Sequence, residues 1–196
     1  QEGIIDEHTR FSCYHGYPPL GGKPACHGHA SPLSIQYALA TSCNAFFCYG
    51  LNGMLSNRSK YASVSEAFDI WKDHVVDMGF GHKLGVDLPS EKRGFIPNSK
   101  FYDKVKNGRP WNAHSVISIA IGQGEILATP LQIANFAALT ANRGYFYTPH
   151  AVKSRKGAEL DTTFTKRHDS GIRREFFEIT VNGMADAVTR GTCYGI

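Results

Sequence analysis

Residues 118–144 read SIAIGQGEILATPLQIANFAALTANRG, a glycine-rich turn followed by a helix with clear start and stop signals. Thr129 has the side chain of a helix N-cap, and Pro130 suits the first helical turn. Gln132 completes a capping box with Thr129. Gly144 is the glycine that commonly follows the last residue of a helix. The sequence therefore predicts a helix between Pro130 and Gly144.

Two other segments have the period of an amphipathic helix. Residues 63–78 begin with Ser63 and Glu66, a capping-box pair, and continue with apolar residues at helical spacing. Residues 173–190 form the last predicted helix. We expect its apolar face to be buried, and that face comprises Phe177, Val181, Met184 and Val188.

A pair of shorter helices is predicted upstream, joined by the tripeptide Ser42-Cys43-Asn44. Ser31 and Pro32 provide an N-cap and a first-turn proline for a helix that runs to about Thr41. Asn44 can cap a second, mainly apolar helix, which we expect to be central and buried. On its own, S-x-N has an ordinary explanation, in which Ser42 ends one helix and Asn44 begins the next.

Few strands are expected. The apolar run 116–121 predicts a strand or a buried extended segment, and 145–152 an edge strand that contains a proline. Residues 81–114 predict a long excursion with a short helix near 99–106. With residues 1–30 rich in loops and 31–196 mainly helical, the fold class is mostly α (α+β), with helix well in excess of strand.

Composition fits one compact domain or one lobe of a larger one: 196 residues, 42% hydrophobic and a formal net charge of +4. The densest basic cluster, residues 153–156, has no aromatic residues around it, so we interpret it as a solvated loop and expect no nucleic-acid partner. No stretch approaches the ~20 apolar residues of a membrane-spanning helix.

Cysteine and histidine gather near the beginning of the chain. The chain has five cysteines, an odd number that leaves at least one thiol outside any disulfide. Cys26 and His29 have the spacing of a short metal-binding clasp. The residues leave three alternatives open, namely a zinc site, a Cys13–Cys26 disulfide, or buried thiols beside exposed histidines.

Three segments carry a resemblance to a known family. They are LATSCNAFFCYGLNGML at 39–55, MGFGHKLGVDLPSEKRGFIP at 78–97 and the segment at 118–144 quoted above. In this order they resemble class B penicillin-binding proteins of the rod-elongation type, over about residues 10–195. The resemblance implies the helical lobe of the penicillin-binding transpeptidase and serine β-lactamase-like fold.

The resemblance also implies an activity. A serine attacks the D-Ala-D-Ala bond of a peptidoglycan stem peptide, and a second stem peptide resolves the acyl-enzyme; β-lactams bind at the same site. By position, Ser42 would relay a proton between the general-base lysine and the leaving group, and Asn44 would hold that lysine and the backbone amide of the substrate. A hydroxyl both donates and accepts a hydrogen bond, and a neutral amide orients without adding charge.

Two of the family's motifs are absent from this sequence. No serine is followed three residues later by lysine, so the S-x-x-K nucleophile is missing. K-T-G is missing too, and the nearest match, Lys153-Ser154-Arg155, ends in arginine. Residues 1–196 are therefore interpreted as an internal fragment of one transpeptidase domain, inactive by itself.

The resemblance implies ligands, partners and a location as well. Some relatives of this type carry a zinc site beside S-x-N, and by position its ligands here would be Cys13, Cys26, His29 and Cys43, with His27 as the rival of His29. The parent protein would be periplasmic, anchored in the inner membrane, and in contact with elongation-complex membrane proteins. A catalytically dead sensing or docking module and a β-lactamase relative remain the alternatives.

Overall fold

A computed structural model describes residues 1–153 and 161–195 of the chain. Its α-helices are α1 (Ile35–Ala40), α2 (Asn44–Leu55), α3 (Val64–Asp77), α4 (Ser99–Val105), α5 (Pro130–Ala141) and α6 (Arg174–Arg190). Short 3₁₀ helices are η1 (Pro18–Leu20), η2 (Ala113–Ile121) and η3 (Thr162–Phe164). Strands β1 (Tyr145–Tyr147) and β2 (Arg167–Asp169) pair antiparallel, with Phe146 opposite His168. Most of the basic cluster at 153–156 lies outside the described residues.

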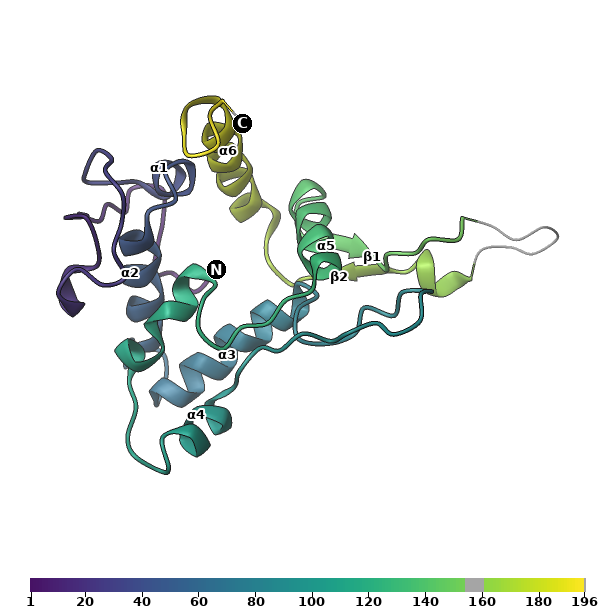
Figure 1. The fold of residues 1–196 in the computed structure, drawn as a ribbon, viewed down its shortest axis with the longest axis horizontal. Coiled ribbons are helices and arrows are strands. Elements are labelled where there is room, and N and C mark those ends of the chain that lie inside the picture. The colour runs from purple at the N-terminus through teal and green to yellow at the C-terminus, as the bar shows by residue number, and fades with distance from the viewer. Residues whose placement is uncertain (154–160, 196) are drawn as a thin grey trace.

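The elements form an elongated, mainly helical structure (Figure 1). The N-terminal segment (residues 1–34), α1 and α2 lie at one end, and the β1–β2 hairpin extends toward the other. Helix α6 returns from the hairpin to pack on α1, so the last helix of the chain contacts the first. No helix within the described parts of the chain is both long and apolar enough to cross a membrane.

Three clusters of buried side chains hold these elements together. One joins α2 and α3 to α4 and η2 around Phe68 and Tyr102. A second packs the N-terminal segment on α1 and α2 around Tyr17 and Phe46. A smaller third cluster joins α5, β1 and α6 through Leu139, Phe146 and Phe177. The N-terminal segment thus owes its order to contacts with α2, since η1 is its only helical turn among the described residues.

The strongest sequence signals are confirmed. Helix α5 begins at Pro130, and Thr129 and Gln132 form the expected reciprocal capping box. Helices α3, α4 and α6 occupy the predicted segments, and the fold is mostly helical with two short strands. At α3, Ser63 accepts the Glu66 backbone N–H, but the Glu66 carboxylate accepts from the amide of Ala62 rather than that of Ser63.

Two predicted boundaries near Ser42 are wrong. Helix α1 begins at Ile35 and is capped by Ser34, because Leu33 forms an antiparallel bridge with Phe11 and must stay extended. Helix α2 is capped by Cys43, and Asn44 is its first residue. The Asn44 side chain donates instead to the carbonyl of Ala25, 2.7 Å away.

Three other predictions also need correction. The run at 116–121 is neither a strand nor extended, since η2 covers it, capped by an Asn112–Ser115 capping box. Strand β1 ends at Tyr147, well short of residue 152. In α6, Phe177 is buried as expected, but Met184 is 45% and Val188 60% exposed. Among the described residues, only the Phe177 end of that face is packed in a buried cluster, with Leu139 and Phe146.

Candidate active site

Ser42 occupies the turn between α1 and α2, and we call residues 38–44 the Ser42 corner. The Cys43 amide donates to Ala38 O at 2.9 Å, and the Ser42 amide to Leu39 O at 3.3 Å. These two bonds form a Schellman motif, which ends a helix with one residue in the left-handed conformation. Ser42 is that residue, with a φ of 51°. Glycine normally fills this position, because a side chain there costs about 1–2 kcal/mol.

The motif explains how a serine becomes exposed between two buried residues. Thr41 and Cys43 are buried, whereas Ser42 is exposed. The left-handed turn directs the chain from α1 into α2 within one residue, and Cys43 then serves as the N-cap of α2. The backbone thus presents the Ser42 hydroxyl at the surface on a rigid support made of two helix ends.

Asn44 lies half-buried at the start of α2, on the side of the corner that faces the N-terminal segment. Its Nδ2 is committed to Ala25 O, and within the described residues no group donates to its Oδ1. Ser42 and Asn44 are therefore both at the corner, as the sequence predicted. Asn44 has the additional task of tying residue 25 to α2.

The other partner of the corner is Thr192, which sequence reasoning missed. Ser42 Oγ lies 2.9 Å from Thr192 Oγ1, across 150 residues of sequence. The Thr192 amide donates to Ala40 O at 3.0 Å, which places the chain after α6 along the end of α1. The only local signal was the small residue Gly191, which allows this close approach.

Four potential metal ligands meet directly behind the corner. The ligand atoms of Cys13, Cys26, His29 and Cys43 all lie within 4.8 Å of one another. A tetrahedral zinc site has ligand–ligand separations of roughly 3.5–3.8 Å, so small side-chain movements would bring the four ligand atoms around one ion. The cysteine-rich segment, residues 1–34, contributes three of the four side chains.

The donor chemistry fits a soft metal ion. His29 Nε2 lies 3.2 Å from Cys26 Sγ, and its Nδ1 is 3.0 Å from Ala30 O. With Nδ1 directed to that carbonyl, Nε2 is the ring nitrogen that faces the thiols and would bind a metal ion. His27 packs edge-to-face against His29 but is outside the cluster. All five cysteines are free thiols, so the Cys13–Cys26 disulfide is not formed.

The thiols differ in their proton affinity. Burial pushes the pKa of Cys26 upward, but hydrogen bonds from His29, the Asn44 backbone and the neighbouring thiols outweigh burial and lower the pKa below its usual value. Burial raises the pKa of the Cys43 thiol to about 12. Of these two thiols, Cys26 is therefore the one more ready to become a thiolate, the form that binds a metal.

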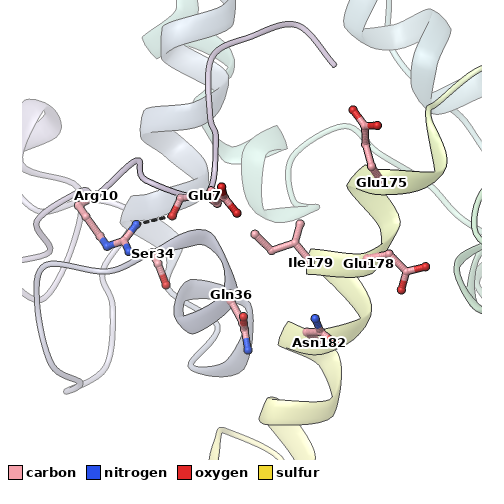
Figure 2. A pocket seen from close by; sticks show the side chains of 8 residues that line it. All are labelled: Glu7, Arg10, Ser34, Gln36, Glu175, Glu178, Ile179 and Asn182. Atoms are coloured by element: carbon pink, nitrogen blue, oxygen red, sulfur yellow. Dashed lines mark hydrogen bonds between the residues drawn. The ribbon is translucent and has the colours of Figure 1, made fainter.

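A separate cleft of about 390 Å³ opens between the N-terminal segment, α1 and α6 (Figure 2). Glu7, Glu175 and Glu178 make its lining acidic, and the one basic side chain, Arg10, donates to Glu7 O at 2.7 Å. None of the sequence-predicted site residues lines it. The Ser42 corner is thus an exposed turn rather than part of this cleft.

Comparisons with known proteins agree with this geometry. The family described as "Penicillin binding protein transpeptidase domain" matches residues 1–195. The peptidoglycan D,D-transpeptidase MrdA of Acinetobacter baumannii is 31% identical over 99% of this chain and 28% of its own length. Penicillin-binding protein 2A of Bacillus subtilis is 26% identical over 100% of this chain, again 28% of its own length.

Solved structures of the same family share the fold. Pseudomonas aeruginosa PBP2, in complex with WCK 5153, superposes with a TM-score of 0.76 at 22% identity, over 97% of this chain and 42% of that one. Helicobacter pylori PBP2, in a complex with MreC, gives 0.71 at 24% identity, over 97% of this chain and 33% of that one. The chain spans just over a quarter of the length of the curated relatives it matches. It belongs to the penicillin-binding protein transpeptidase family, among relatives of the penicillin-binding protein 2 type.

Proposed function

We propose that this chain supplies the S-x-N corner of a peptidoglycan D,D-transpeptidase that cross-links stem peptides and is acylated by β-lactams. One observation carries the proposal: the serine of S-x-N is the exposed residue of a turn fixed by two helix ends. A proton-relay group must be presented to substrate in a constant position, and such a turn meets that need. The family match over residues 1–195 supports the reaction type.

In the proposed reaction, the nucleophilic serine of an S-x-x-K motif attacks the D-Ala-D-Ala carbonyl. Its proton passes to the lysine, and the departing D-alanine takes a proton through Ser42. The amine of a second stem peptide then attacks the ester and releases the serine. Asn44 Oδ1 would accept from the lysine or from the substrate amide, while its Nδ2 stays bound to Ala25 O.

We propose zinc as the ion for Cys13, Cys26, His29 and Cys43, because three thiolates and one imidazole are a common structural zinc set. With four protein ligands the ion has no open position for water, so its contribution would be structural. Cys43 lies between Ser42 and Asn44, and the Cys26 sulfur accepts a hydrogen bond from the Asn44 backbone N–H. The ion would thus fix the cysteine-rich segment against the two residues that act on substrate.

The cellular setting follows from the same relationship. We propose a periplasmic domain of a protein anchored in the inner membrane, with the S-x-x-K and K-T-G motifs in flanking sequence. The complex of Helicobacter pylori PBP2 with MreC supports an elongation-complex membrane protein as a partner. We place that contact in regions outside this chain.

Labelling with a fluorescent penicillin tests the reaction. The 196-residue chain should give no boil-resistant adduct, because it has no S-x-x-K serine. The protein extended through both flanking motifs should be labelled. In that protein Ser42→Ala should slow acylation by roughly two to four orders of magnitude, the scale of general acid–base catalysis.

Ser56→Ala is the matched control, since Ser56 is an exposed serine at the other end of α2. It should leave acylation unchanged. An adduct on the short chain would show that another serine can act as nucleophile. An extended protein that is never labelled would point to the rival function, a catalytically dead docking module, which the missing nucleophile favours.

A further inference from the structure

Thr192 contacts Ser42 in a way that bears on the proposed reaction. It lies just after α6, and two bonds hold it to the end of α1: its amide donates to Ala40 O at 3.0 Å, and its hydroxyl points to the same carbonyl at 3.4 Å. Its hydroxyl is also 2.9 Å from Ser42 Oγ. Residue 192 is therefore fixed by its backbone before its side chain meets Ser42.

The surroundings leave this contact little freedom. A Cβ built on Gly191 would lie 1.9 Å from Ala40 O, so only glycine lets the chain come this close. About two turns earlier, within α6, a Cβ on Gly183 would lie 2.7 Å from Leu39 Cβ. Gln36 also donates to Asp186 at 2.7 Å across the same interface. The end of α6 is thus packed tightly against the helix that presents Ser42.

The hydrogen bonds also have a direction. A hydroxyl has one proton to donate, and Ala40 O can only accept. If the Thr192 proton is directed to Ala40 O, the contact with Ser42 must run from the Ser42 hydroxyl to Thr192 Oγ1. The lone pairs of Ser42 Oγ then face away from Thr192, toward solvent, where substrate would lie. A relay group needs a free lone pair to accept the proton from the lysine; as it does so, the Ser42 hydroxyl turns from Thr192 and gives its own proton to the departing D-alanine.

We infer that Thr192 is a positioning residue for the transpeptidation reaction, which orients the Ser42 hydroxyl by accepting a hydrogen bond from it. This inference rests on the proposed function and adds to it a residue outside the S-x-N motif. Thr192 does not touch the reacting atoms. It acts through Ser42 and should therefore affect the rate of acylation rather than the affinity for the β-lactam.

The test uses the protein extended through both flanking motifs and measures acylation by a fluorescent penicillin over a range of concentrations. Thr192→Val keeps the shape and removes the acceptor, and should lower the acylation rate constant about tenfold with little change in the half-saturating concentration. Thr192→Ser keeps the hydroxyl and should stay within about threefold of wild type. Thr189→Val, one turn back on α6 and exposed, should have no effect.

A double mutant separates positioning from general support of the fold. If Thr192 acts through Ser42, adding Thr192→Val to Ser42→Ala should cause less than about a twofold further loss. A full tenfold loss in that background, or a Thr192→Ser variant as slow as Thr192→Val, would overturn the inference. Thr192→Ala replaces Thr192→Val in the cycle if the valine variant does not fold.

The two proposals fail in different ways. A labelled wild type with an equally fast Thr192→Val variant refutes the role of Thr192 and leaves the proposed function in place. An unlabelled wild type refutes the proposed function, and with it this inference.

Discussion

The Ser42 corner and the cysteine-rich segment lie against each other but are ordered by different means. The corner is built from backbone hydrogen bonds between helix ends, with the left-handed Ser42 at its centre. The segment has a single 3₁₀ turn and depends on side chains: aromatic packing on α2, the Asn44–Ala25 bond and the thiol–imidazole cluster. Backbone hydrogen bonds therefore set the shape of the corner, and side-chain contacts hold the segment behind it.

The largest effect should come from the cluster. Cys26→Ser removes the ligand whose thiol contacts both His29 and the Asn44 backbone. Elemental analysis of protein purified without added metal should find about one zinc per wild-type chain and almost none in the variant. The free energy of unfolding should fall by about 3 kcal/mol or more, because loss of a structural metal is among the most damaging changes.

Cys193→Ser is the control for that experiment, since Cys193 is an exposed thiol outside the cluster. It should retain the zinc and the stability of the wild type. Wild-type protein that contains no metal and shows a Cys13–Cys26 disulfide in its mass spectrum would refute the zinc proposal. The cysteine-rich segment would then be held by a covalent cross-link.

A smaller effect is expected at the far end of the cysteine-rich segment, where Glu2 anchors it to α3. Burial works against the ionised carboxylate, but bonds from Lys60, Tyr61 and His74 outweigh it and lower the pKa of Glu2 to about 2, from an ordinary 4.5. The contribution of Glu2 to stability is therefore complete above about pH 4.5 and is lost as the pH falls toward 2. Glu2→Gln should cost about 1–2 kcal/mol at pH 7.

Urea unfolding of wild type and Glu2→Gln between pH 7 and pH 3 measures that difference. The difference in free energy of unfolding between the two proteins should become smaller as the pH falls from 7 to 3. Glu7→Gln is the control, because Glu7 lies in the same segment with a highly exposed side chain. A gap that stays constant with pH would mean that the charge of Glu2 is not what anchors the segment.

The smallest effect, with the opposite sign, belongs to the corner. Ser42→Ala and Ser42→Gly both remove the hydroxyl, but only glycine adopts a φ of 51° without steric cost. The glycine variant should be more stable than the alanine variant by about 1 kcal/mol, although neither relays a proton. Thermal unfolding of the pair measures the difference. An alanine variant of equal or greater stability would show that the corner relaxes out of the left-handed conformation.

Local sequence patterns predicted some of the helices and their ends correctly and others wrongly, for physical reasons. Local signals were reliable where one segment carries its own cap, as at Thr129 and Gln132. They failed at 116–121, where the capping pair Asn112 and Ser115 favours a 3₁₀ helix that an apolar run does not indicate. Met184 and Val188 have the periodicity of a buried face, but periodicity does not reveal whether a partner is present.

The candidate site divides in the same way. Ser42 and Asn44 could be named from the motif, whereas the four candidate metal ligands came from the family resemblance; the structure brings those four side chains within 4.8 Å of one another beside Ser42 and Asn44. The contact of Thr192 with Ser42 joins residues 150 positions apart, and no local pattern encodes such a pair. The left-handed conformation of Ser42 was also hidden, because glycine rather than serine is the usual signal for it.

The contact between Ser42 and Thr192, which lie 150 residues apart in the sequence, has a consequence for folding during synthesis. A ribosome adds about 5–20 residues per second, so residue 192 emerges roughly 8–30 s after residue 42. Throughout that interval α1 has no α6 to pack against, and Ser42 has no partner for its hydroxyl. The backbone of the corner can therefore form long before the Ser42 hydroxyl gains its partner, and a nascent chain stalled before α6 would expose the α1 surface to chaperones and proteases.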